Sequence, residues 1–193
     1  MERRQPVPLV LLDRDGVVIV NRETNIKRRQ DIALIPRAAP AIARLNGAGC
    51  RVAICTNQPE VARGAMTQAE LDAVHEALRC MLAREGAMVE TILCCTSTCK
   101  DPWRKPSPGM LNTALQRYGA RASDTPFVGD QTDDLKAAFH AGCPRYLVRT
   151  GLGRKTLEQG IPEYVNPVIV ADDLWQAAER ILEHAASQAA PPK

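Results

Sequence analysis

The sequence predicts an α/β fold in which a parallel sheet is covered by helices on both faces. Short apolar runs rich in β-branched residues alternate with longer Ala- and Leu-rich segments along the chain. Alternation of this kind is typical of strand-helix-strand units, which build parallel sheets. In addition, polar residues follow three of the predicted strands at their carboxyl ends, the edge at which open α/β sheets bind ligands.

Each predicted strand is a short apolar run bounded by polar or turn-forming residues. The six runs cover residues 7–12, 51–55, 91–95, 125–128, 145–149 and 168–170. Five longer segments between and after them carry helical patterns, near residues 38–47, 68–85, 108–118, 132–141 and 173–186.

Helix ends are marked by capping residues and glycines. Thr67-Gln-Ala-Glu70 is a capping-box pattern, in which each side chain can satisfy a backbone donor of the first turn. Glycines fall where four of the helices should stop, at positions 49, 86, 119 and 142. We expect a single domain over residues 1–187 and a disordered tail over residues 188–193.

Composition excludes several classes of partner. The 193 residues carry a formal charge of only +3, too mild to indicate nucleic acid. No apolar run approaches the roughly 20 residues that cross a bilayer, and the N-terminus lacks the features of a signal peptide. The seven cysteines are scattered and odd in number, so we expect reduced thiols in the cytoplasm, in a monomer or small homo-oligomer.

Two carboxylates, Asp13 and Asp15, stand inside the most apolar stretch, PVPLVLLDRDGVVIV. A calcium loop starting at Asp13 is excluded, since its fifth, sixth and twelfth positions would be Val17, Val18 and Thr24. An Asp-Gly turn without a function stays open for this segment.

The other polar clusters also have purely structural alternatives. Thr56-Asn57 and Gly129-Asp130 follow later strands and could simply cap helices. Lys105 could be an exposed loop cation. The order and placement of all the clusters nevertheless favour one shared site on the sheet edge.

The segments DRDGV, TN, RKP and GDQTDD resemble the four motifs of the haloacid dehalogenase (HAD) superfamily of phosphatases, over about residues 7–151. The longer phrases RKPSPGML and GDQTDDLKAAFHAG resemble its heptose bisphosphate and histidinol-phosphate phosphatases. The resemblance implies a Rossmann-like core. Only about 40 residues separate Asp15 from Thr56, and 47 separate Thr56 from Arg104, so no large cap domain fits between the motifs.

The resemblance also implies roles for individual residues. Asp13 would be the nucleophile and Asp15 the general acid and base. Thr56 and Lys105 would bind the oxygens of the reacting phosphate. Mg²⁺ would be held by Asp13, Asp130 and the main-chain carbonyl of Asp15.

More peripheral roles follow from position. Asp134 would orient the metal shell or its waters. Asn57, Arg63 and Arg104 are candidates for binding the substrate, and the cluster Lys27-Arg28-Arg29 could meet a second phosphate or form a solvated turn.

The zinc loop common in such relatives is incomplete here. Cys94, Cys95 and Cys99 are present, but no histidine is near, and Asp101 and Trp103 replace the later cysteine pair. Structural zinc needs four Cys or His ligands, so we do not expect it.

The lead hypothesis is a Mg²⁺-dependent phosphatase of a small phosphorylated metabolite. Its expected substrate is a sugar bisphosphate, D-glycero-D-manno-heptose 1,7-bisphosphate, from which it would remove the 7-phosphate. A phosphatase of histidinol phosphate or another small metabolite is the alternative. A non-catalytic phosphate-binding protein is a third hypothesis.

Overall fold

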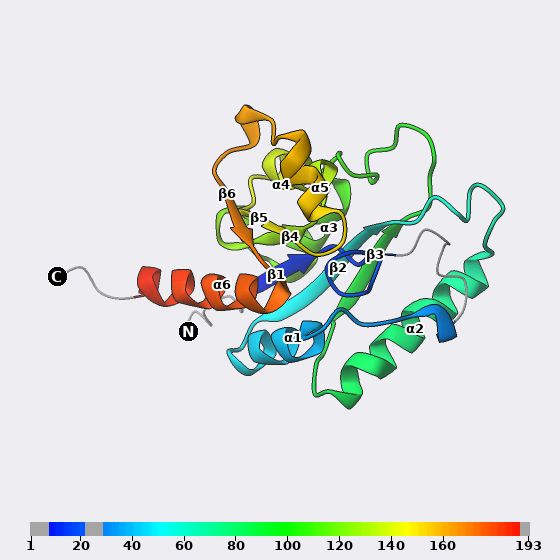
Figure 1. Ribbon diagram of the computed structural model, residues 1–193, viewed down its shortest axis with the longest axis horizontal. Coiled ribbons are helices and arrows are strands. Elements are labelled where there is room, and N and C mark those ends of the chain that lie inside the picture. Colours follow the sequence, from blue (N-terminus) through cyan, green and yellow to red (C-terminus); the bar gives the residue numbers. More distant parts are fainter. Residues whose placement is uncertain (1–7, 22–28, 190–193) are drawn as a thin grey trace.

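A single parallel sheet of six strands organises the protein (Figure 1), in a computed structural model that describes residues 8–21 and 29–189. The strand order is β3-β2-β1-β4-β5-β6. The strands are β1 (Leu9–Leu12), β2 (Arg51–Asn57), β3 (Thr91–Cys95), β4 (Phe127–Gly129), β5 (Arg145–Val148) and β6 (Val168–Ala171).

Helices connect consecutive strands, as parallel pairing requires. The α-helices are α1 (Ala38–Gly47), α2 (Gln68–Arg84), α3 (Gly109–Tyr118), α4 (Thr132–Ala141), α5 (Gly153–Gln159) and α6 (Leu174–Ala189). Three short 3₁₀ helices complete the described elements, η1 (Arg29–Asp31), η2 (Ala122–Asp124) and η3 (Glu163–Val165).

Alternating strand residues face opposite layers of helices. Val10 and Leu12 of β1 pack into a core shared with α1, α2 and α6, whereas Leu9 and Leu11 pack into a second core shared with α3 and α4. The two helical layers are visible on opposite sides of the sheet in Figure 1. Both faces of the sheet are therefore covered, as the apolar character of the strands predicts.

The capping predictions are confirmed. Thr67 and Glu70 form a complete capping box at the start of α2. Gly119 and Gly142 end α3 and α4 with left-handed backbone conformations. Such conformations cost glycine little because it has no Cβ atom.

One helix was not predicted. The segment of α5, GRKTLEQ, is seven residues long and carries a single large apolar residue, Leu157, so it gives almost no periodic signal. Most other boundaries agree within two residues, but α6 continues to Ala189 instead of ending near residue 186. Residues 190–193 of the expected tail lie outside the described residues.

The chain reverses direction across the sheet at β1. From β1 it moves outward through β2 and β3, then returns to β4 on the other side of β1. This is the switch point at which sheets of this topology open a crevice at their carboxyl edge. Asp13, Thr56 and Asp130 lie at or just beyond the ends of β1, β2 and β4, so all three lie at that edge of the sheet.

No large cap domain interrupts the described part of the fold. Between β1 and β2 that part forms a loop, η1 and α1, and between β2 and β3 it forms a loop and α2. None of the described helices combines the length and apolar character needed to cross a membrane.

Candidate active site

A buried lysine joins two of the predicted site carboxylates. Nζ of Lys105 donates to Oδ1 of Asp13 and to Oδ1 of Asp134, each at 2.6 Å. All three side chains are nearly inaccessible to solvent. Burial alone would lower the pKa of Lys105, but the two carboxylates outweigh it and raise this pKa above its ordinary value. The ammonium group is therefore a fixed positive charge beside Asp13.

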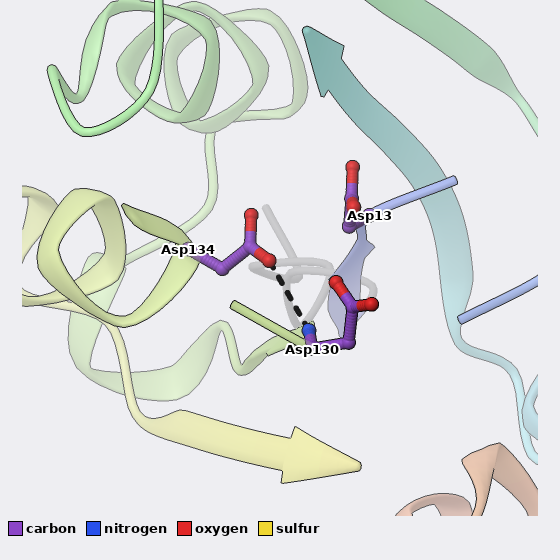
Figure 2. A group of neighbouring side chains, drawn as sticks. All are labelled: Asp13, Asp130 and Asp134. Atoms are coloured by element: carbon purple, nitrogen blue, oxygen red, sulfur yellow. Dashed lines mark hydrogen bonds between the residues drawn. The ribbon is translucent and has the colours of Figure 1, made fainter. Parts of the chain in front are cut away.

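Asp130 completes a group of three carboxylates, with candidate ligand atoms all within 4.8 Å of one another (Figure 2). Oδ2 of Asp130 accepts a hydrogen bond from the main-chain N–H of Leu152 at 2.7 Å. Its other oxygen, Oδ1, is buried without a hydrogen-bond partner. Because an unpartnered buried oxygen is costly, it indicates a ligand that the protein itself does not supply.

Crowding of these carboxylates shifts their titration. Burial, followed by the charges of Asp134 and Asp13, raises the pKa of Asp130 to about 8. Burial also raises the pKa of Asp13 to about 7, although Lys105 opposes this shift. A divalent cation among the three would favour their ionised forms. Hard carboxylate oxygens are also the donors that Mg²⁺ prefers, so the residues fit a magnesium site.

Asp134 differs from the other two carboxylates because both of its oxygens are engaged. Oδ1 accepts from Lys105, and Oδ2 accepts from the main-chain N–H groups of Asp130 and Gln131 at 3.1 and 3.0 Å. The carboxylate lies in the first turn of α4, where the helix dipole also favours negative charge. This arrangement favours an orienting role over direct metal ligation.

Asp15 is held by side chains on two sides. Arg14 donates from Nε to Oδ2 and from Nη2 to Oδ1, both at 3.1 Å. Gln58 donates to Oδ2 at 2.7 Å and also to Oγ1 of Thr56 at 3.0 Å. The carboxylate of Asp15 is 23% exposed, so it can still meet a substrate.

Asn57 lies against the main chain of Lys105. Its Nδ2 donates to the Lys105 carbonyl at 3.0 Å, and its Oδ1 accepts from the Lys105 N–H at 3.1 Å. Both ends of the amide thus fix the loop that carries the lysine. Asn57 also lines the cavity over the site, and its predicted contact with the substrate stays a prediction.

The two candidate substrate arginines are placed differently. Arg104 lines the cavity over the site and donates to the main-chain carbonyl of Ser97 at 2.8 Å. Arg63 is largely exposed, pairs with Glu60 at 2.7 Å, and is absent from the cavity lining. Only Arg104 is positioned for the predicted contact.

The cavity has a volume of about 260 Å³, and Asp13, Asp15, Thr56 and Lys105 all contribute to its wall. Asp133, for which the sequence indicates no role, also lines it. In the basic cluster, Lys27 and Arg28 lie outside the described residues, as does the Arg29 side chain.

Asp130 is enclosed by α5, by the loop between β5 and α5 and by the loop after β1, an arrangement that the sequence did not reveal. Thr156 donates from Oγ1 to the main-chain carbonyl of Asp130 at 2.8 Å. Gly16 and Gly151 pass so close that an added Cβ would lie 2.0 and 2.2 Å from Oδ2 of Asp130. The Asp15-Gly16 pair indicates a turn in the sequence, but the sequence does not indicate that Gly16 packs against Asp130.

The thiols predicted not to bind zinc are dispersed. Cys94 and Cys95 are neighbours on β3, so their side chains point to opposite faces and join different cores. Cys99 is exposed in the following loop. Within the described ranges, the three aspartates form the only Cys, His, Asp or Glu group that could hold a metal ion.

Comparison with known proteins identifies the family. Residues 102–177 match a family model described as HAD-hydrolase-like. The chain is 41% identical over 180 residues to the D-glycero-beta-D-manno-heptose-1,7-bisphosphate 7-phosphatase of Bordetella bronchiseptica, covering 92% of this chain and 99% of that protein. The Pseudomonas aeruginosa protein of the same name is 40% identical over 177 residues, covering 91% and 98%.

A solved structure agrees with this assignment. The crystal structure of D,D-heptose 1,7-bisphosphate phosphatase from B. bronchiseptica, complexed with magnesium and phosphate, matches with a TM-score of 0.86 at 40% identity. The match covers 92% of this chain and 99% of that one. The chain therefore belongs to the haloacid dehalogenase-like hydrolases, and within them it is a phosphatase.

Proposed function

We propose that this phosphatase removes the 7-phosphate of D-glycero-D-manno-heptose 1,7-bisphosphate, in a Mg²⁺-dependent reaction with an aspartyl-phosphate at Asp13. The observation that carries the chemistry is the buried group of Asp13, Lys105, Asp130 and Asp134 at the switch point of the sheet. The names of the relatives, which cover nearly the whole chain, support the choice of substrate.

Asp13 and Asp15 divide the reaction into two displacements. A carboxylate oxygen of Asp13 attacks phosphorus, the bond from phosphorus to the sugar oxygen breaks, and Asp15 gives its proton to that oxygen. A water molecule then attacks the aspartyl-phosphate while Asp15 takes one of its protons. The bond from phosphorus to Asp13 breaks, releasing inorganic phosphate and restoring the Asp13 carboxylate and the protonated form of Asp15.

The remaining residues of the site hold charge and geometry. Asp13, Asp130 and the main-chain carbonyl of Asp15 would hold Mg²⁺, with Asp134 orienting the surrounding groups. The ion supplies charge neutralisation between nucleophile and phosphate, together with polarisation of the phosphate oxygens. The Lys105 ammonium, placed by Asn57 and paired with Asp134, stabilises negative charge on the reacting phosphate.

Selectivity for one phosphate is proposed to come from the rim of the open cavity. Arg104 lies next to Lys105 in sequence and lines the cavity, so its guanidinium can bind beyond the reacting phosphate. Thr56 would contribute its hydroxyl to the reacting phosphate. We also propose that the protein acts in the cytoplasm, which its seven unpaired cysteines support. It would act there as a monomer or small homo-oligomer, without a nucleic-acid partner, and its mild net charge of +3 supports the absence of nucleic acid.

The test is a substrate screen of the purified protein with Mg²⁺. Heptose bisphosphate, other sugar phosphates, histidinol phosphate and nucleotides are compared, and phosphorus NMR identifies which phosphate is lost. We expect the highest kcat/KM for the heptose bisphosphate, with release of the 7-phosphate. A clear preference for histidinol phosphate would overturn the substrate, and absence of any Mg²⁺-dependent turnover would overturn the reaction.

Two variants examine the roles of the carboxylates. Asp13→Asn and Asp15→Asn should each abolish turnover of the sugar phosphate while leaving the circular dichroism spectrum unchanged, because a carboxamide is neither a nucleophile nor a proton donor of this kind. More than a few per cent of wild-type activity in either variant would contradict the assigned role.

A further inference from the structure

Arg14 is a buried cation that the proposed reaction does not use. It lies between Asp13 and Asp15 in the chain, and its residue is only 2% exposed, the largest among the fully buried side chains. A guanidinium is seldom buried unless hydrogen-bond acceptors surround it. Two of its nitrogens donate to the two carboxylate oxygens of Asp15, in the planar fork geometry that arginine offers and lysine lacks.

The second partner of Arg14 is a histidine from a distant helix, which contacts its third guanidinium nitrogen. Nη1 of Arg14 lies 3.1 Å from Nε2 of His75, on the side of α2 that carries the buried residues Leu71, Val74 and Leu78. Arginine has no acceptor, so Arg14 donates and Nε2 must be the unprotonated ring nitrogen. His75 is consequently neutral, with its proton on Nδ1.

Electrostatics keep His75 in that form. Burial, followed by the positive charge of Arg14, lowers the pKa of His75 to about 4. A protonated imidazole would place two cations in direct contact in a poorly solvated space. At neutral pH the histidine is therefore a hydrogen-bond acceptor of fixed orientation.

We propose that His75 and Arg14 are positioning residues that hold the Asp15 carboxylate in the orientation needed for proton transfer to the leaving oxygen. His75 fixes the guanidinium, which fixes both oxygens of Asp15, while Gln58 holds Asp15 from the other side at 2.7 Å. The inference rests on the proposed role of Asp15 as general acid. The proposal gives α2 a second role besides covering the sheet, because this helix supplies His75.

The experiment compares substrates whose leaving groups need a proton to different degrees. Departure of a sugar alkoxide needs general-acid help, whereas departure of 2,4-dinitrophenolate needs almost none. Because kcat/KM reports the first irreversible step, it isolates cleavage of the ester from later hydrolysis of the aspartyl-phosphate. The measured quantity is kcat/KM of each variant, relative to wild type, for the heptose bisphosphate and for 2,4-dinitrophenyl phosphate.

His75→Leu places an apolar side chain of similar size in α2 and removes Nε2, the acceptor for Arg14. We expect it to lower kcat/KM for the sugar phosphate roughly tenfold to hundredfold, part of the about 10²–10⁴-fold that general acid catalysis supplies. Because 2,4-dinitrophenolate leaves almost without help from a general acid, kcat/KM for 2,4-dinitrophenyl phosphate should change by less than about threefold. His75→Gln, whose amide oxygen can accept from Arg14, should recover most of the sugar-phosphate activity.

Further variants separate a local effect from a failure to fold. Arg14→Lys keeps the charge but loses the fork, and it should show the same selective loss even if His75→Leu does not fold. Glu76→Gln, at the neighbouring exposed position of α2, should match wild type on both substrates. Hydrolysis of 2,4-dinitrophenyl phosphate itself reports that the site is assembled.

Failure of this inference can be distinguished from failure of the proposed function. Asp15→Asn is the reference variant. Loss of the general acid must lower kcat/KM for the sugar phosphate and leave kcat/KM for the dinitrophenyl ester nearly unchanged. Suppose that Asp15→Asn shows this selectivity, but that His75→Leu and Arg14→Lys either lower kcat/KM equally for both substrates or leave both values unchanged. The positioning role is then overturned, and the proposed function is not. If wild type cleaves neither substrate, or Asp15→Asn shows no selectivity, the general-acid assignment falls and this inference with it.

Discussion

Gly16→Ala, compared with Gly49→Ala, tests whether close packing around Asp130 forms the metal site. Both glycines adopt positive φ angles, of +84° and +83°. An added Cβ would have nothing within 4 Å at Gly49, but at Gly16 it would lie 2.0 Å from Oδ2 of Asp130 and 2.6 Å from its Cγ. The backbone strain is therefore matched, and the two variants differ in the collision with Asp130 and in a close approach to Gly151, whose Cα would lie 3.1 Å from the new Cβ of Gly16→Ala.

The magnitude follows from these distances. Forcing an alanine into a left-handed conformation costs about 1–2 kcal/mol, and we expect this loss of unfolding free energy in both variants. Ordinary contacts begin at 3.4 Å, so the Asp130 carboxylate in Gly16→Ala must retreat by 3.4 − 2.0 = 1.4 Å. A shift of that size breaks the 2.7 Å hydrogen bond to Leu152. Misplacement by about 1 Å can cost on the order of 10²-fold in rate.

The assay combines urea unfolding, calorimetric titration with Mg²⁺ and steady-state kinetics on both purified variants. We expect Gly49→Ala to bind Mg²⁺ and turn over substrate as wild type does, with only the loss of stability. Gly16→Ala should in addition bind Mg²⁺ more weakly and lose at least about a hundredfold in kcat/KM. Equal Mg²⁺ affinity and activity in the two variants would refute the claim that Gly16 is needed to accommodate Asp130.

Three further predictions concern the rim, an ionisable core residue and zinc. Arg104→Ala should reduce kcat/KM for a heptose bisphosphate by about tenfold to hundredfold, the loss of ~1.5–3 kcal/mol expected for a hydrogen bond to a charged group, whereas p-nitrophenyl phosphate should be little affected. The surface-paired Arg63→Ala is its control, and equal losses on both substrates would place Arg104 at the reacting phosphate instead. For His75, the unfolded state takes up its proton near pH 6.5 and the folded state only near 4, so stability should fall as pH drops from 7. At pH 5 the loss is RT ln[(1 + 10^1.5)/(1 + 10^−1)], about 2 kcal/mol, and His75→Gln should lack this part of the pH dependence in urea unfolding. Elemental analysis of the purified protein should find no stoichiometric zinc, and a full equivalent would show that Cys95 or its neighbours have acquired further ligands.

The sequence predicts the architecture well where it is specified by the periodicity of apolar residues and by the positions of polar residues at strand ends. Strand-helix alternation predicts the six strands, and the carboxyl-end rule predicts that Asp13, Thr56 and Asp130 share one edge of the sheet. It failed for α5, whose seven residues pack through Thr156 and close backbone contacts rather than an apolar stripe. Such short elements are specified by tertiary context more than by local periodicity.

Whether a site residue could be predicted depends on whether it lies in a short sequence motif. Groups that lie in short motifs, such as Lys105, could be named from the sequence because those motifs resemble the ones of the haloacid dehalogenase superfamily. The partners that hold them could not, since the contact of His75 with Arg14 spans 61 positions and depends on the angle of α2. A polar residue beside the apolar stripe of that helix was the one available signal. Asn57 and Arg63 stand near the motifs, and the structure adds that Asn57 holds the Lys105 loop while lining the cavity, whereas Arg63 pairs with Glu60 outside the lining.

The strand order has a consequence for how activity is acquired during folding. Leu11 of β1 pairs with Ala53 of β2 on one side and with Phe127 of β4 on the other, so the crevice exists only after the chain has returned across its first strand. Contacts between residues so far apart in sequence form late and slowly compared with local ones. Regain of turnover after dilution from denaturant should accordingly lag behind recovery of helical circular dichroism, and the enzyme's own reaction becomes a reporter of complete sheet assembly.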